Sequence, residues 1–197
     1  MIREKNKAKI IGKISEPFVF SHHTHDADIY RTVLDIKRES DYIDKIPIEM
    51  VATPHFIETF QVGTQVSIDG EVRTYNSEGH LKVVLFVNLI KKVENEQDMN
   101  VVEMTGYICK PTIYRKTPLG RRICDFLVAI PRTTKKSSYV PCLVWGRNAD
   151  FAQHLNIGEK VLLQGRIQSR EYVKKISDEE LVTKIAREVS CSVIKVL

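Results

Sequence analysis

The chain has 197 residues, 43% hydrophobic and 28% charged, a composition that supports a folded core and excludes a disordered or collagen-like chain. This length suits one large domain or two small ones. The formal net charge of +5 is uneven: residues 1–97 have 13 Lys and Arg against 15 Asp and Glu, whereas residues 98–197 have 17 against 10. A basic second half indicates a polyanionic partner, because binding to phosphates releases condensed counterions.

No part of the sequence has the apolar length of a targeting or membrane-spanning segment. Residues 1–12 are basic but lack the apolar run of about 7 to 15 residues that a secretory signal needs. No segment approaches the roughly 20 apolar residues that span a bilayer. The four cysteines form no CxxC pair and lie in apolar runs. We therefore expect a cytoplasmic protein with no membrane contact, disulfide or zinc site.

The predicted elements are short strands separated by turns. The first half has a weak helix at residues 55–60 and ends in a polar, charged joint at residues 93–100. The second half has a turn at residues 117–120 and a helix at residues 148–155, for which Asn148 is the expected N-cap. The strands predicted for the second half are residues 101–108, 123–130, 139–145, 160–171 and 181–197.

The two halves repeat one pattern of glycines and prolines. The offset is 94 residues at first and 95 after one added residue, and the matched pairs are Gly12 and Gly106, Pro17 and Pro111, Pro47 and Pro141, Gly63 and Gly158, and Gly70 and Gly165. Glycine and proline occur where the backbone geometry requires them, so this agreement indicates two copies of one fold. We predict an N-terminal domain at residues 1–96 and a C-terminal domain at residues 101–197.

Five strands with a helix between the third and the fourth are the layout of an OB barrel. The predicted fold class is therefore all-β, with two tandem five-stranded OB-fold barrels, each with one short helix between strands 3 and 4. The ligand surface of this fold is the face of strands 2 and 3 with the loops beside it.

Side-chain alternation divides the strand at residues 139–147 into a core side and an open side. Val140, Cys142 and Val144 share the side that we assign to the core. The other side has Tyr139, Pro141, Leu143, Trp145 and Arg147. A lone Trp in a strand is more often a core residue. Trp145, however, lies on the same side of the strand as Tyr139 and Arg147, which favours the open face. An aliphatic residue there, Leu143, suggests that a partner subunit covers part of this face.

A second basic strand adds to the same surface. On residues 166–172, Ile167 points inward, and Arg166, Gln168, Arg170 and Tyr172 point outward. Aromatic rings between arginines suit unpaired bases and their phosphates, because stacking contributes about 1 to 3 kcal/mol per base and tolerates any sequence.

The run from residue 139 to residue 172 closely resembles the bacterial and phage single-stranded DNA-binding protein (SSB) family. The resemblance extends less sharply back to Gly106 and is faint in the first half. It implies that Tyr139, Trp145 and Tyr172 stack on bases. It also implies sequence-tolerant binding and protection of single-stranded DNA in replication, recombination or repair, without enzymatic activity, a cofactor or a small-molecule substrate.

Basic residues near these rings are the expected phosphate contacts. The loop at residues 131–138 lacks the aromatic that the family often has there, so contact at this loop would be electrostatic. The candidates are Arg121, Arg122, Arg132, Lys135, Lys136, Arg147, Arg166, Arg170, Lys174 and Lys175.

The first copy lacks the stacking set. Lys45, Val51 and Glu71 stand at the positions of Tyr139, Trp145 and Arg166, and only Arg73 and Tyr75 remain as weaker candidates for nucleotide contact. We expect this copy to support assembly or to bind weakly.

The resemblance also bears on assembly and cellular role. Family members usually present four OB barrels per assembly, so chains with two barrels are expected to pair as homodimers. Cellular members end in an acidic tail that recruits other enzymes, whereas this sequence ends at Leu197, after its last predicted strand. We therefore expect an accessory, mobile-element or primosome-like member, associated with the nucleoid of a bacterium or a phage-infected cell.

Two other function classes stay open. One is a primosome-type adaptor whose OB surfaces hold proteins, and the other is an RNA-binding OB module, since no residue pattern here reports a contact to a 2′-hydroxyl. Residues 21–28 contain three histidines and two aspartates, for which we expect a solvated loop rather than a metal site. No catalytic motif is present, and we expect no enzyme.

Overall fold

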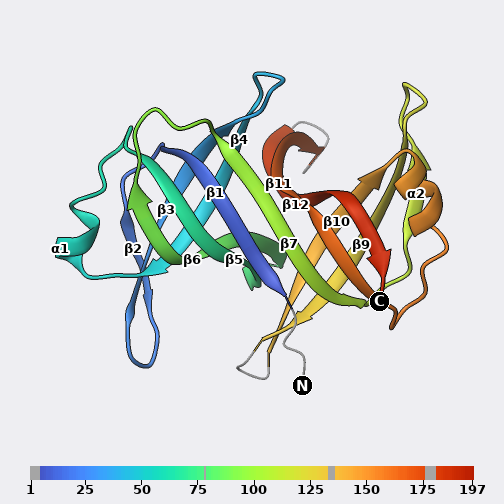
Figure 1. Ribbon diagram of the computed structural model, residues 1–197, viewed down its shortest axis with the longest axis horizontal. Coiled ribbons are helices and arrows are strands. Elements are labelled where there is room, and N and C mark those ends of the chain that lie inside the picture. The colour runs from blue at the N-terminus through green and yellow to red at the C-terminus, as the bar shows by residue number, and fades with distance from the viewer. Residues whose placement is uncertain (1–4, 78, 133–135, 176–180) are drawn as a thin grey trace.

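The computed structural model describes residues 5–77, 79–132, 136–175 and 181–197. Over these ranges the chain forms two barrels side by side (Figure 1). The strands of the first barrel are β1 (Asn6–Ile14), β2 (Val19–His23), β3 (Asp28–Lys37), β4 (Ile43–Val51), β5 (Gln65–Ser77) and β6 (His80–Lys92). Those of the second barrel are β7 (Met99–Ile108), β8 (Ile113–Lys116), β9 (Arg122–Pro131), β10 (Ser137–Trp145), β11 (Lys160–Lys175) and β12 (Leu181–Val196).

The strand order confirms the predicted all-β tandem OB layout. The sheet runs β2-β3-β4-β6-β5-β1-β7-β11-β12-β10-β9-β8, and the additional pairings β3–β1 and β7–β9 close the two barrels. The helices α1 (Pro54–Ile57) and α2 (Arg147–Ala152) lie between β4 and β5 and between β10 and β11, as the repeat predicts. Each barrel also has a short edge strand, β2 or β8, that the sequence patterns did not predict.

One glycine at the same place in each barrel allows closure. A Cβ added to Gly12 would lie 2.7 Å from the carbonyl oxygen of Asp35, and one added to Gly106 would lie 2.6 Å from that of Ala129. Real Cβ contacts are longer than this, so only glycine lets β1 approach β3 and β7 approach β9 this closely. The matched glycines of the sequence therefore mark matched crossings of the two barrels.

An asparagine side chain extends the ladder at the start of each barrel. Asn6 Nδ2 donates to Val72 O (2.9 Å) and its Oδ1 accepts from Val72 N (3.0 Å). Asn100 makes the same two bonds to Ile167, at 2.7 and 3.0 Å. In the repeat Asn6 is equivalent to Asn100 and Val72 to Ile167. The two barrels therefore share this local hydrogen bonding as well as the strand order.

The two barrels are joined by their first strands. β1 and β7 pair antiparallel, with Asn6 opposite Met104 and Ile10 opposite Asn100. In the repeat Asn6 is equivalent to Asn100 and Ile10 to Met104, so the second pair repeats the first with the two strands exchanged. Such a self-complementary ladder is the arrangement found in two-fold dimers, here made within one chain. β7 begins at Met99, two residues before the predicted start of this strand.

A second contact repeats on both sides of this junction. The backbone N–H of Lys45 on β4 donates to Ser169 Oγ on β11 (2.9 Å), and that of Tyr139 on β10 donates to Thr74 Oγ1 on β5 (2.8 Å). Lys45 is equivalent to Tyr139 and Thr74 to Ser169 at the two offsets of the repeat. The junction therefore has an approximate two-fold axis: β4 of the first barrel packs against β11 of the second, and β10 of the second packs against β5 of the first.

The predicted cap of the second helix is wrong. The N-cap is Gly146, with a φ of 57° and no side-chain capping bond, and the helix ends at Ala152 rather than at residue 155. Asn148 lies inside the helix, where its Nδ2 donates to Ser192 O on β12 (2.8 Å). The sharp turn after β10 needs a left-handed residue at 146, which glycine adopts without strain. Among the described residues, no helix is long and apolar enough to cross a membrane.

Candidate nucleic-acid interface

Strand β10 places two of the predicted rings at the surface. The alternation is confirmed for the core side, since Val140, Cys142 and Val144 are buried. On the other side Tyr139 is 47% exposed and Trp145, the last residue of the strand, is 39% exposed. The indole is therefore partly packed and partly open to solvent, as a ring that stacks on a base must be.

A groove of about 630 Å³ lies between the two barrels beside Trp145. Its lining residues from the first barrel are Arg38, Tyr42, Ile43 and Lys45, and those from the second are Arg121, Trp145, Arg166, Gln168, Ser169, Arg170, Glu171 and Ile185. Five of these residues are cationic and one is acidic, which makes the groove attractive to phosphate.

The cations of the groove differ in how far they are neutralised. Arg121 and Arg166 are exposed, and neither forms an ion pair with any other residue that the structure describes. Arg170 Nε donates to Glu188 Oε1 (3.2 Å), and its guanidinium carbon lies 5.7 Å from the centre of the Tyr172 ring. The two free guanidinium groups are therefore the ones best placed to hold phosphates.

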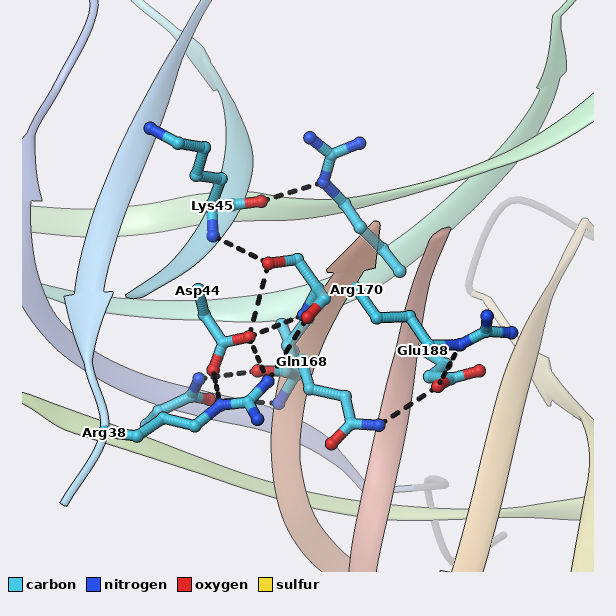
Figure 2. A network of polar contacts seen from close by, with 10 residues as sticks. Arg38, Asp44, Lys45, Gln168, Arg170 and Glu188 are labelled. Atoms are coloured by element: carbon cyan, nitrogen blue, oxygen red, sulfur yellow. Dashed lines mark hydrogen bonds and ion pairs between the residues drawn. The ribbon is translucent and has the colours of Figure 1, made fainter. Parts of the chain in front are cut away.

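A buried polar network joins the two barrels beside the groove (Figure 2), and its residues Arg38, Gln168 and Ser169 also line the groove. The Asp44 side chain, 1% exposed, accepts two bonds from Arg38, Nε to Oδ2 and Nη2 to Oδ1, both 2.6 Å. Its Oδ1 also accepts from the backbone N–H of Ser169 (2.6 Å). The bond to Asp44 raises the pKa of the Arg38 guanidinium above its usual value. This network connects β4 of the first barrel directly to β11 of the second.

Arg132, a predicted phosphate contact, is engaged within the protein. Its Nε donates to Ser138 Oγ and its Nη2 to Thr74 O, both at 2.9 Å, across the other side of the junction. Burial, and next the nearby charge of Arg73, lower the pKa of Arg132. Arg122 is paired with Asp150 at 2.5 Å. These two arginines are therefore less available to a nucleic acid than Arg121 and Arg166.

The remaining predicted cations are more peripheral. Lys136 and Arg147 are exposed, and neither lines the groove. Lys135 lies outside the described residues. Lys174 and Lys175 belong to β11, but their side chains are not among those described.

The equivalent face of the first barrel is neutralised by its own residues. Arg73 is paired with Glu71, and its guanidinium carbon lies 3.4 Å from the centre of the Phe86 ring. Tyr75 OH donates to Glu49 Oε1 (3.2 Å), and burial, with the charge of Glu49, raises the pKa of this phenol. The two weaker candidates of the first copy are thus both held by internal acidic partners.

The interpretation of Leu143 was wrong. Leu143 is only 2% exposed within this single chain. Its strand β10 pairs with β9 and β12 and also packs against β5 of the first barrel. The single chain therefore already buries the residue that suggested a partner subunit, and Leu143 gives no support to dimerisation.

The histidine-rich segment and the cysteines show no metal arrangement in the described part of the chain, where no three His, Cys, Asp or Glu residues are grouped for an ion. His23 Nδ1 lies 2.5 Å from Asp28 Oδ1 on the surface. The four cysteines are free, and burial raises the pKa of the Cys142 thiol well above its usual value.

The sequence analysis missed the wall that the first barrel contributes to the groove. Arg38, Tyr42 and Ile43 come from the connection between β3 and β4 and from the start of β4. The repeat gave no signal for Tyr42, because its equivalent in the second copy is Lys136. Only the docking of the barrels brings this ring to the same groove as Trp145.

Comparison with known proteins identifies the family of the second barrel. Residues 99–193 match the model of the single-strand binding protein family. Single-stranded DNA-binding protein 3 of Clostridium acetobutylicum is 32% identical over 97 residues, which cover 46% of this chain and 67% of the relative. The chain belongs to the single-strand binding protein family. Single-stranded DNA-binding protein 1 of Staphylococcus aureus is 30% identical over 94 residues, which cover 44% of this chain and 56% of that protein.

The SSB-family sequence match is confined to the second barrel, whereas the structural likeness spans the chain. The wild-type single-stranded DNA binding protein from Thermus aquaticus superposes with a TM-score of 0.75 at 15% identity, covering 99% of this chain and 94% of that one. At this identity the likeness concerns the fold alone. It confirms the tandem OB architecture for both halves of this SSB-family chain.

Proposed function

We propose that this chain binds single-stranded DNA with little sequence preference, mainly through its second barrel. The observation that carries the proposal is the half-exposed indole of Trp145 in a groove beside Arg121 and Arg166, two cations without an acidic partner among the described residues. Membership of the single-strand binding protein family supports the same function.

The chemistry of the groove accounts for sequence tolerance. An indole offers a flat surface to any unpaired base and contributes about 1 to 3 kcal/mol per stacked base. The guanidinium groups contact phosphates, which every nucleotide has, and release counterions on binding. Tyr139 and Tyr172 extend the stacking surface, and Lys136, Arg147 and Arg170 extend the basic one. Such binding protects exposed strands during replication, recombination or repair and requires no catalytic group.

Intrinsic fluorescence tests the proposal directly, because Trp145 is the only tryptophan of the chain. Adding oligo-dT should lower its emission, and the affinity should fall steeply as salt rises. Competition with oligo-U of the same length separates DNA from RNA binding. Unchanged emission at low salt, with no binding by filter retention, would refute the proposal and favour an adaptor that binds proteins.

We also propose that two chains pair, giving four OB barrels per assembly. The support is the family membership together with the two barrels that each chain contains. Multi-angle light scattering should give twice the monomer mass at micromolar concentration. A monomer mass across the whole accessible range would contradict this part of the proposal.

A further inference from the structure

The groove beside Trp145 continues onto the first barrel. Arg38, Tyr42 and Ile43 form its other wall. Given the proposed binding of single-stranded DNA, we propose that Tyr42 is a further base-stacking platform, so that one strand of DNA bridges the two barrels. The first barrel would then take part in binding through a loop, and not through the face equivalent to that of the second barrel.

Tyr42 has the exposure of a stacking residue. It is 41% exposed, close to the 39% of Trp145, and it lines the same groove. The guanidinium carbon of Arg38 lies 4.5 Å from the centre of the Tyr42 ring. This cation–π contact supports the ring from one side, and the exposed part of the ring is available to an unpaired base.

The platform is held rigidly by its own turn. Arg38 N donates to Tyr42 O (2.8 Å), and Asp41 N donates back to Arg38 O (3.0 Å). Asp41 has a φ of 63°, a left-handed conformation that an aspartate tolerates in tight turns. A ring fixed before binding loses little conformational entropy when a base stacks on it.

The same arginine ties the platform to the strand that bears the phosphate-binding cations. Arg38 is held by Asp44, and Asp44 accepts from the backbone N–H of Ser169 on β11 (2.6 Å). Arg38 Nη2 also donates to Ser169 O (3.3 Å). Ser169 lies three residues after Arg166, so Tyr42 has a defined position relative to the basic strand (Figure 2 shows Arg38 and Asp44 facing β11).

The test compares Tyr42→Ala with Phe56→Ala by anisotropy of labelled oligo-dT. Phe56 is a matched control, because it is also an exposed aromatic of the first barrel, 42% exposed, but lines a different cavity. With an oligo-dT of about 30 nucleotides, long enough for two OB folds, Tyr42→Ala should bind about 10-fold more weakly. Phe56→Ala should bind like the wild type. Tyr42→Phe, which keeps the ring, should restore binding.

Length dependence adds a second readout. An oligo-dT of about 5 nucleotides, near the lower site size of one OB fold, should bind Tyr42→Ala and the wild type equally. Photocrosslinking of the wild type to an oligonucleotide containing 5-iododeoxyuridine should label the peptide with Tyr42. This experiment needs no variant, so it remains decisive if Tyr42→Ala fails to fold.

The outcomes separate this inference from the proposed function. If the wild type binds, Trp145→Ala weakens binding, and Tyr42→Ala binds every length like the wild type, the bridging strand is refuted while the proposed function stands. Crosslinks confined to the second barrel would refute it in the same way. A wild type that binds no oligo-dT refutes both.

Discussion

Where the second barrel exposes Trp145 at the end of β10, the first barrel has Val51 at the equivalent end of β4. The difference continues on the neighbouring strand, where Arg166 is free of acidic partners among the described residues and its equivalent Glu71 is paired with Arg73. The backbone plan of the two barrels is the same. Duplicated OB barrels can therefore diverge in binding through a few surface residues, while the glycines and ladder bonds that close them are kept.

The two sides of the junction differ in the same manner. On one side the buried Asp44 carboxyl group accepts two bonds from Arg38, whereas on the other its equivalent is Ser138, which accepts one bond from Arg132. The groove with Trp145 lies on the Asp44 side. An arginine paired with a carboxyl group thus supports the side that we propose to bind DNA, and an arginine bound to a hydroxyl and a backbone carbonyl supports the other.

The largest expected effect distinguishes these two sides. Asp44→Ala leaves Arg38 without its carboxylate and the Ser169 N–H without its acceptor, so we expect a loss of about 3 to 5 kcal/mol in the free energy of unfolding. Ser138→Ala removes one neutral acceptor and should cost about 1 kcal/mol. Urea denaturation measures both losses, provided that the free energy of unfolding of each variant depends on urea concentration with the same slope as in the wild type. Equal losses would show that the charge at Asp44 adds nothing to the junction.

The next effect concerns the two strand ends. Trp145→Ala should weaken oligo-dT binding by about 1 to 3 kcal/mol, because a stacked base loses its platform. Val51→Ala, at the equivalent and exposed position, is the control and should leave affinity within experimental error. Titration by anisotropy measures both variants. Comparable losses at the two sites would mean that both barrels bind through the same face.

Charge substitutions sharpen the comparison between the basic strands. Arg166→Gln should reduce the slope of log affinity against log salt by about 0.7, the value for one phosphate contact on a single strand. Glu71→Gln changes the charge by the same amount in the other direction, yet it should leave the slope unchanged, since Glu71 lies outside the groove. A steeper slope for Glu71→Gln would indicate that net charge, and not the groove, governs binding.

The smallest effect is expected at Arg132. Two of its guanidinium nitrogens already donate to Ser138 and Thr74. Arg132→Gln should therefore change the salt slope by less than half of the change at Arg166, and its main consequence should be a small decrease in unfolding midpoint. A full loss of about 0.7 in the slope would place Arg132 among the phosphate contacts.

Much of the fold follows from local signals in the sequence. Gly12 and Gly106 recur because each barrel closes by a strand crossing that no side chain fits, and the repeat could be found from such residues. Alternation along β10 correctly assigned Val140 and Val144 to the core and Trp145 to the surface. The cap at Asn148 was mispredicted, because a preference for a residue type cannot show that the preceding turn requires a glycine.

By itself, then, the sequence determined the duplicated OB plan, the face that presents Trp145 and the basic character of the second half. The tertiary structure alone decided that Leu143 is buried, that Arg132 is used in the junction and that Tyr42 reaches the groove. The reason is physical: strand period and turn chemistry act between near neighbours, whereas the pairing of β1 with β7 and of Asp44 with Ser169 joins residues about a hundred positions apart. Those contacts depend on how two complete barrels dock.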